Sequence, residues 1–138
     1  MKFTRKASAH WKGTGKDGGG TVSTQSTVLD KTAYSYKTRF EEGVGTNPEE
    51  LIGAAHAGCF TMQLSFLLSE KGYTPGHLHT DAKVTFEDGS ITSVQLDLKG
   101  TVEGISESEF EEIAEKAKTV CPISKLLDTT IELTAVLM

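Results

Sequence analysis

The sequence predicts an α+β fold over residues 1–138, with antiparallel sheets around one long buried helix. Three observations lead to this prediction. The first forty residues alternate between polar and apolar as β-strands do, residues 47–71 form one long apolar helical stretch, and two further strand-like runs follow it. The expected order is βββ-α-ββ-α-α-β, which lacks the regular strand–helix alternation of a Rossmann sheet.

Length and composition fit one globular domain and exclude several classes of protein. The chain has 138 residues, of which 37% are hydrophobic and 24% charged, so it can form a core and does not have a disordered composition. Its net charge of −5 disfavours nucleic-acid binding, which usually needs a basic surface. The N-terminus lacks the apolar run of a signal peptide. We therefore expect a cytoplasmic protein with neither a nucleic-acid nor a membrane partner.

The first forty residues are expected to form a three-stranded antiparallel meander. Residues 3–11 alternate in polarity, and residues 21–29 are rich in Thr, Ser and Val. The aromatic residues of segment 34–40 would share one face of a third strand. The Gly-rich segment 13–21 is typical of a flexible hairpin loop, and it lacks the Gly-Lys-Ser/Thr ending of a phosphate-binding loop.

A strong helix start follows this meander. Asn47 can cap the helix, Pro48 suits its first turn, and Glu50 has the spacing of a capping box. The helix is expected to run to Lys71 and to stop at Gly72.

The apolar residues of this helix lie almost all round it, which is typical of a helix buried on most sides. The most apolar part, residues 51–68, includes polar residues such as His56 and Gln63 and falls short of the roughly 20 apolar residues of a membrane span. We therefore interpret it as the core helix of a soluble protein. One layer of strands cannot cover such a helix, so a partner subunit is expected on its far side.

The second half of the chain begins with two strands and ends with one. Residues 78–86 and 91–102 are strand-like and are joined by an Asp-Gly turn, which favours a hairpin. Residues 106–109 form another capping-box pattern before a helix, and Pro122 ends that helix and can start a short new one. Residues 129–138 are expected to form the last strand.

The two cysteines, Cys59 and Cys121, are too few for a disulfide-stapled scaffold. In a reducing compartment a Cys pair is more often catalytic, redox-active or metal-binding than structural. A cysteine in a buried helix is usually a small hydrophobic residue, whereas the helix break beside Pro122 can present a thiol. The sequence leaves open whether the two come within the Cα separation of about 5.5 Å that a disulfide needs.

A nucleophilic Cys59 would need a nearby cation, because the thiolate is the reactive form. Arg39 and His56 are candidates, and His56 lies three residues before Cys59 on the same helix face. His56 could equally be a hydrogen-bonded core histidine or half of a Cys-His hydrolytic pair.

Metal binding is a further option that the spacing of the ligands does not favour. Cys59, Cys121 and His56 could supply three ligands, and His77 and His79 lie two apart on one strand face. Neither set has the CxxC or HExxH spacing of strong zinc motifs.

Two motifs surround the two cysteines. Residues 47–60 read Asn-Pro-Glu-Glu-Leu-Ile-Gly-Ala-Ala-His-Ala-Gly-Cys-Phe, and residues 121–127 read Cys-Pro-Ile-Ser-Lys-Leu-Leu. Together they resemble the OsmC/Ohr family of thiol peroxidases. Segments 20–24 and 36–41 resemble the OsmC branch in particular, so the resemblance covers nearly the whole chain as a single OsmC-like domain.

The resemblance implies an intertwined homodimer that reduces organic hydroperoxides to alcohols, with no bound cofactor or metal and a lipoylated protein or small dithiol as reductant. Cys59 matches the peroxidatic cysteine, and Cys121 matches the resolving cysteine that forms a disulfide with it. Arg39 matches the active-site arginine, which would stabilise the thiolate and the leaving alkoxide. Glu49 matches the glutamate that would orient this arginine through a bidentate pair.

Spacing then predicts sites shared between two chains. Glu49 and Cys59 are ten residues apart on one helix, which corresponds to about 15 Å along its axis. Two such helices packed antiparallel across a two-fold axis would bring Glu49 of one chain to Cys59 of the other.

The hydrophobic residues near Cys59 are expected to favour bulky apolar hydroperoxides over hydrogen peroxide; these are Phe60, Leu64 and Ile123. Two alternatives to a peroxidase remain. One is a redox-sensing dithiol protein without turnover, and the other is a metal-binding or hydrolytic protein that uses Cys59 and His56.

Overall fold

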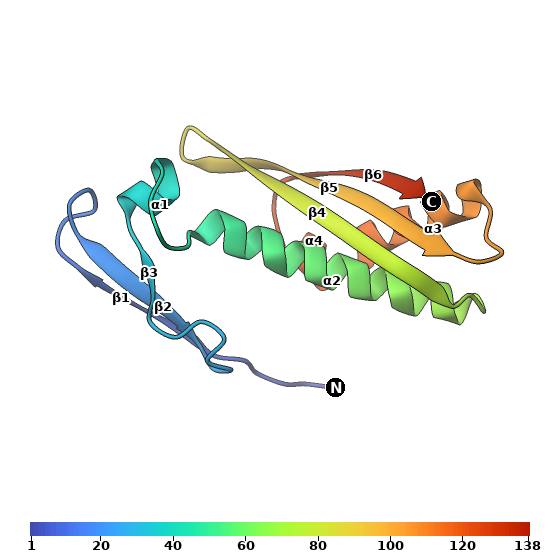
Figure 1. Cartoon of the computed structure of the whole chain (residues 1–138), viewed down its shortest axis with the longest axis horizontal. Helices are drawn as coiled ribbons and strands as arrows, with labels where there is room; N and C mark the ends of the chain where they lie inside the picture. The colour runs from blue at the N-terminus through green and yellow to red at the C-terminus, as the bar shows by residue number, and fades with distance from the viewer. The chain divides into compact units, whose positions relative to one another are not determined.

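The computed structural model describes all 138 residues (Figure 1). The chain divides into two compact units, residues 1–51 and residues 52–138, and each is described by itself. The order of elements is βββ-αα-ββ-αα-β, which confirms the α+β class and adds one helix to the expected order. The assignment of residues 1–138 to one domain stays a prediction.

The first unit contains a three-stranded antiparallel meander, as predicted. Its strands are β1 (Ala7–Lys12), β2 (Gly19–Thr24) and β3 (Thr32–Tyr34), with β2 in the middle. The loop between β1 and β2 starts at Gly13, whose φ of 97° is in the left-handed region that favours glycine. The first two strands are shorter than expected. β1 starts at Ala7 and not at residue 3, and β2 ends at Thr24 and not at residue 29.

The prediction of a strand over residues 34–40 was wrong beyond Tyr34, because the segment Tyr36–Phe40 forms a short helix, α1. Ser35 caps it: its hydroxyl accepts from the Thr38 N–H at 3.3 Å, and the Thr38 hydroxyl accepts from the Ser35 N–H at 2.8 Å. This reciprocal capping satisfies backbone groups that a strand would have paired with a neighbour. The local capping bonds therefore outweigh the alternating pattern of aromatic residues.

The long helix α2 (Pro48–Glu70) begins as predicted, with the Asn47 side chain accepting from the Glu50 N–H at 2.8 Å. The second half of the expected capping box is absent, because the Glu50 carboxylate accepts from the Thr46 hydroxyl at 2.8 Å instead. Gly72 lies just beyond the end of the helix with φ of 89°, and the N–H groups of Gly72 and Tyr73 bond back to Ser69 and Leu68. This is a Schellman ending, and it confirms the predicted stop.

The second unit has a three-stranded sheet of β4 (Pro75–Glu87), β5 (Ser90–Val102) and β6 (Thr130–Leu137), with β5 in the middle. The hairpin between β4 and β5 turns at Asp88 and Gly89, which both have positive φ. β6 pairs with β5 in parallel, so the expectation of purely antiparallel sheets was wrong. The reason is the crossover through α3 (Glu107–Val120) and α4 (Pro122–Leu126), which returns the chain in the same direction.

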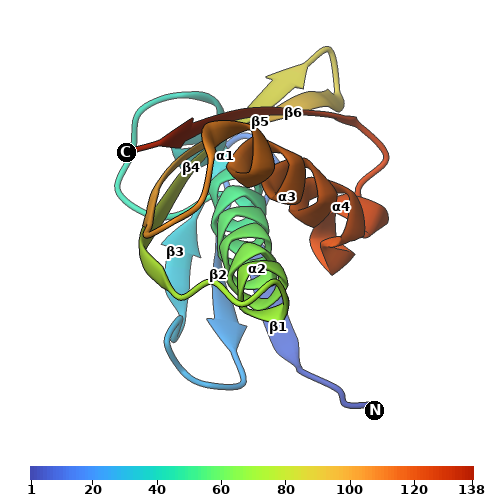
Figure 2. The same cartoon turned by 90° about the vertical axis from the view of Figure 1, so that its right-hand side faces the viewer.

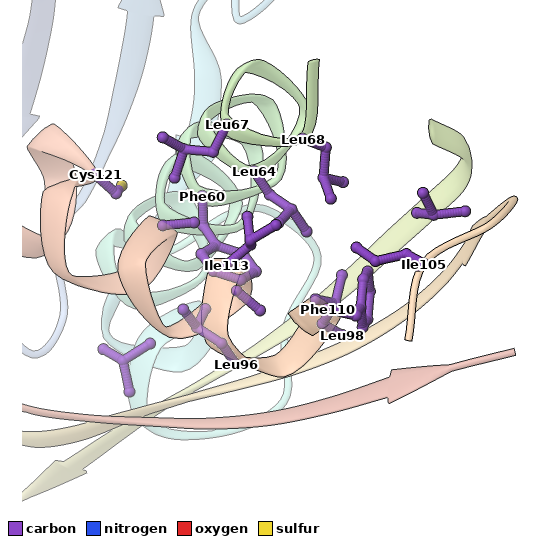
Figure 3. Close-up of a cluster of buried hydrophobic side chains, with 14 residues drawn as sticks. Phe60, Leu64, Leu67, Leu68, Leu96, Leu98, Ile105, Phe110, Ile113 and Cys121 are labelled. Atoms are coloured by element: carbon purple, nitrogen blue, oxygen red, sulfur yellow. The ribbon is translucent and has the colours of Figure 1, made fainter. Parts of the chain in front are cut away.

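The core of the second unit lies between the sheet and the helices α2 and α3 (Figures 2 and 3). Helix α3 is capped by Ser106, whose hydroxyl accepts from the Glu109 N–H at 3.2 Å. The Glu109 carboxylate accepts from the Tyr73 hydroxyl at 2.7 Å, so it does not complete the expected capping box. The fully buried side chains of the core include Phe60, Leu64, Leu68, Leu96, Leu98, Phe110 and Cys121.

Helix α2 is buried on one side only, so the prediction that it is buried on most sides does not hold within a single chain. Six of its residues are buried, whereas Met62 and Phe66 are 63% and 59% exposed. By length and composition alone α2 could cross a membrane. Its buried side belongs to the core of the second unit, as in the core helices of soluble proteins.

Candidate active site

The two thiols that the sequence singled out lie side by side in the second unit. Cys121 is fully buried at the junction of α3 and α4, and Cys59 is half-buried in the middle of α2. Both are free, and the Cys121 thiol donates to the Cys59 sulfur over an Sγ–Sγ distance of 2.9 Å. Figure 3 shows the Cys121 side chain directed toward α2. A disulfide between them would need only a short approach of the two sulfur atoms.

The surroundings of Cys59 keep its thiol protonated. Burial raises the pKa of Cys59, and the neighbouring Cys121 side chain raises it further. The backbone N–H of Ile123, in the first turn of α4, bonds to Cys59 and acts in the opposite direction. Since the net shift is upward, a reactive thiolate at this position needs an additional positive charge.

His56 does not act as that positive charge in the second unit. Its imidazole is fully buried, and burial lowers the pKa of His56, which favours the neutral ring. Its Nε2 lies 2.7 Å from the Ser124 hydroxyl, and its Nδ1 is buried without a hydrogen-bond partner. The structure therefore supports the hydrogen-bonded core histidine among the alternatives for His56.

Ser124 is the polar neighbour of the cysteine pair that the sequence analysis missed. It lies three residues after Cys121, just as His56 lies three residues before Cys59. The signal was present in the Cys-Pro-Ile-Ser motif, but a serine in such a motif has no expected partner until the fold brings α4 to α2.

Arg39 and Glu49 meet in the first unit, as the resemblance implied. The Arg39 Nε donates to Glu49 Oε1 at 2.9 Å, and one terminal guanidinium nitrogen lies 2.8 Å from the same oxygen. Both contacts use one carboxylate oxygen, whereas a bidentate fork would use both, and Glu49 Oε2 is buried without a partner. The pair joins the helix α1 to the first turn of α2 and fixes the direction of the guanidinium.

An aromatic cavity of about 420 Å³ lies beside Arg39 in the first unit. The guanidinium also stacks over the Phe40 ring, with its carbon 5.1 Å from the ring centroid. Four aromatic side chains line the cavity, together with Arg39, Lys16 and Pro48; the aromatic ones are Trp11, Tyr34, Tyr36 and Phe40. The cavity therefore offers a large apolar surface next to a positive charge.

The structure changes one expectation about the surroundings of Cys59 and bears on the metal-binding alternative. Phe60 and Leu64 are fully buried in the core, so neither can contact a substrate at the surface. No three His, Cys, Asp or Glu side chains come together as a group that could hold a metal ion. Of the residues weighed as metal ligands, His79 pairs with Asp81 at 3.0 Å on the exposed strand β4.

The motifs and the fold agree with comparisons to known proteins. Residues 41–136 match the family model described as OsmC-like protein. The chain belongs to the OsmC family. It is 47% identical over 96% of its length to a protein from Escherichia coli named peroxiredoxin OsmC, of which it covers 96%. It is also 29% identical, over 94% of this chain and 92% of the relative, to the organic hydroperoxide resistance protein of Xanthomonas axonopodis pv. citri.

The fold of the chain is also that of solved OsmC structures. The crystal structure of an organic hydroperoxide resistance protein OsmC from Legionella pneumophila matches with a TM-score of 0.69 and 22% identity, over 99% of this chain and 98% of that one. The 47% identity to peroxiredoxin OsmC identifies the chain as a peroxidase, which agrees with its two adjacent free thiols. The roles of Cys59, Cys121, Arg39 and Glu49 stay predictions.

Proposed function

We propose that this OsmC-family protein reduces organic hydroperoxides to alcohols with Cys59 as the peroxidatic cysteine and Cys121 as the resolving cysteine. The observation that carries this proposal is the Sγ–Sγ distance of 2.9 Å between two free thiols from distant parts of the second unit. A pair at this distance suits a cycle in which one thiol is oxidised and the other closes a disulfide with it.

The chemical steps follow from this geometry. The Cys59 thiolate attacks the distal oxygen of the peroxide, so that the O–O bond breaks and the alkoxide leaves as an alcohol after it takes up a proton. Cys59 is then a sulfenic acid. The Cys121 sulfur attacks the Cys59 sulfur, the S–O bond breaks, and the hydroxyl leaves as water. An external dithiol, either a lipoylated protein or a small dithiol, reduces the disulfide by exchange.

Arg39 supplies the positive charge that Cys59 lacks in its own unit. The guanidinium would stabilise the thiolate and the negative charge that develops on the leaving alkoxide. Glu49 holds the guanidinium in place through the contacts at 2.8 and 2.9 Å. Because Glu49 and Cys59 are ten residues apart along α2, we assign the Arg39–Glu49 pair of one subunit to the Cys59 of another.

A homodimer would provide this shared site, and it would also cover the exposed side of α2. Met62 and Phe66 on that side are largely exposed in the single chain. Beside them an open groove of about 610 Å³ lies between α2 and β4, lined on α2 by residues from Ala57 to Ser65. Apolar surface of this kind is typical of a permanent interface between subunits. A second copy of the chain, related by a two-fold axis, would bury it.

The aromatic cavity beside Arg39 is the proposed site for the organic part of the substrate. It joins an apolar wall to the cation that would face the peroxide oxygens. This favours alkyl and aryl hydroperoxides over hydrogen peroxide, because hydrogen peroxide has no apolar group to place there. The protein would act in the cytoplasm with its two thiols as the only redox groups, without a resident metal or cofactor.

Steady-state reduction of several hydroperoxides tests the proposal. The purified protein is assayed with cumene hydroperoxide, tert-butyl hydroperoxide and hydrogen peroxide, each with dihydrolipoamide or with thioredoxin as the electron donor. We expect turnover with dihydrolipoamide and a higher kcat/KM for the two organic hydroperoxides. Equal or faster turnover of hydrogen peroxide contradicts the preference. Oxidation of Cys59 without any turnover would point instead to a redox-sensing dithiol protein.

A further inference from the structure

The helices α2 and α4 face each other through two matched pairs of residues. Cys59 of α2 lies against Cys121 at 2.9 Å, and His56 of α2 lies against Ser124 at 2.7 Å. His56 lies three residues before Cys59, and Ser124 lies three residues after Cys121. The two contacts are therefore neighbours, and the two segments run antiparallel. The peroxidase proposal uses the sulfur contact and leaves the His56–Ser124 contact without a role.

Apart from these two contacts and the bond of the Ile123 N–H to Cys59, little holds helix α4 in place. It has five residues, and none of them is buried. Ile123 and Leu127 are only partly buried where they pack against the core. A segment with few buried contacts is among the first to open in a folded protein. The resolving Cys121 is the N-cap residue directly before α4, so its position depends on what holds α4 in place.

The His56 imidazole can provide a fixed point for α4. Its side chain is fully buried, so the surrounding core confines it to one orientation. Nδ1 has no partner, which leaves the bond between Nε2 and Ser124 as the one polar contact of the ring. Breaking this bond would leave both ring nitrogens unsatisfied in the core, which opposes the departure of α4.

We infer that His56 is a positioning residue for Cys121: through Ser124 it holds α4 against α2, so that the Cys121 thiol meets the Cys59 sulfenic acid as soon as this forms. The inference rests on the proposed peroxidase function. In the resolving step the Cys121 sulfur bonds to the Cys59 sulfur, the S–O bond breaks, and the hydroxyl leaves with the Cys121 proton as water. Burial lowers the pKa of His56, which keeps the ring neutral and avoids an unpaired charge beside the thiols.

The test separates the two steps of one oxidation. Reduced protein is mixed with one equivalent of cumene hydroperoxide, and samples are quenched with dimedone and a thiol-alkylating reagent. Mass spectrometry then gives the rate at which Cys59 is oxidised and the rate at which the disulfide closes. The variants are Ser124→Ala, which removes the hydroxyl, and Ser124→Thr, which keeps it. Ser69→Ala is the control, because it removes a serine hydroxyl at an exposed position, near the end of α2.

We expect Ser124→Ala to lower the ratio of disulfide closure to Cys59 oxidation roughly fivefold, which is the effect of one hydrogen bond. The dimedone adduct of Cys59 should accumulate, and further oxidation to the sulfinic acid should rise. Ser124→Thr should restore the ratio, and Ser69→Ala should leave it unchanged. In a His56→Leu background, Ser124→Ala should have no further effect.

Three results would overturn the inference, and they tell its failure apart from that of the proposed function. If the wild type closes its disulfide and Ser124→Ala does so equally fast, His56 and Ser124 do not position Cys121. If the peroxide does not oxidise Cys59 in the wild type, the proposed function fails and the inference falls with it. Thermal unfolding of each variant shows whether a slower closure reflects general loss of structure, and closure that slows only in proportion to such a loss also contradicts the inference.

Discussion

The Cys59 and Cys121 sulfur atoms lie 2.9 Å apart although 62 positions separate them in the chain. Two α-helical segments meet there: the middle of α2 and the break between α3 and α4. Pro122 ends the hydrogen-bonding pattern of α3 at this point and lets the chain turn Cys121 toward α2. The contact is built by tertiary packing, so its consequences can be tested one thiol at a time.

Replacing each cysteine by serine should have different effects. We expect Cys59→Ser to abolish peroxide reduction, because the hydroxyl of serine is a far weaker nucleophile than a thiolate. Cys121→Ser should still form one equivalent of Cys59 sulfenic acid but should lose most of its turnover with dihydrolipoamide. Dimedone labelling followed by mass spectrometry measures the sulfenic acid in both variants.

Two results would contradict these roles. Full turnover by Cys121→Ser would show that the reductant attacks the sulfenic acid directly. Dimedone labelling of Cys59→Ser would show that another group reacts with the peroxide.

Loss of the Glu49 charge should slow the oxidation of Cys59. Glu49→Gln keeps the shape of the side chain but weakens the contacts at 2.8 and 2.9 Å that orient Arg39. We expect the rate of Cys59 oxidation to fall about tenfold, which is less than the 10²–10³ that follows removal of a whole charge-stabilising group. Single-turnover kinetics with cumene hydroperoxide measure this rate.

Glu50→Gln is the matched control for this experiment. It removes the same charge from the same helix turn, and the Glu50 carboxylate accepts from the Thr46 hydroxyl. Its rate should stay close to that of the wild type. Equal losses in the two variants would assign the effect to the charge at the start of α2 and not to the orientation of Arg39.

Local signals in the sequence were enough to predict most of the fold. The Asn47 cap, the Gly72 ending and the Asp-Gly turn each depend on a few neighbouring residues, and the structure has all three. The segment 36–40 was mistaken for a strand because its alternation is real, while the capping bonds of Ser35 are equally local and outweigh it. The parallel pairing of β6 depends on the path of α3 and α4, which no local pattern reveals.

The candidate site divides in the same way between local and long-range information. The motifs around Cys59 and Cys121 identified both thiols, but their contact depends on how α4 packs against α2. The partner of His56 could not be predicted either, since Ser124 is 68 positions away. Phe60 and Leu64 were expected near the substrate because they follow Cys59, yet the helical period turns both into the core.

Gly58 offers a stabilising substitution beside the peroxidatic cysteine. In the single chain it is exposed in the middle of α2, and a Cβ atom built there would meet no other atom of that chain within 4 Å. Because glycine costs about 1 kcal/mol relative to alanine inside a helix, we expect Gly58→Ala to raise the free energy of unfolding by about that amount. The melting temperature should rise by about 3 °C.

Gly72→Ala is the contrasting variant for this measurement. Its Cβ would also enter open space, but the φ of 89° is strained for any residue with a Cβ. We expect the free energy of unfolding to fall by about 1 kcal/mol. If urea unfolding shows that both substitutions act in the same direction, backbone conformation is not what distinguishes these two glycines.

Burial of the neutral His56 imidazole should make the protein less stable at mildly acidic pH. Burial lowers the pKa of His56 below its ordinary value of 6.5 in the folded state, so the unfolded chain binds a proton first as the pH falls. The stabilisation is therefore complete above about pH 6.5 and is lost below it, with a slope of at most about 1.4 kcal/mol per pH unit until the folded form is also protonated.

Urea unfolding between about pH 7 and pH 5 measures this slope. His56→Gln should make the slope shallower, while His10→Gln, which replaces an exposed imidazole on β1, should leave it as in the wild type. Equal slopes in the wild type and His56→Gln would mean that the buried ring does not govern the acid sensitivity of the fold.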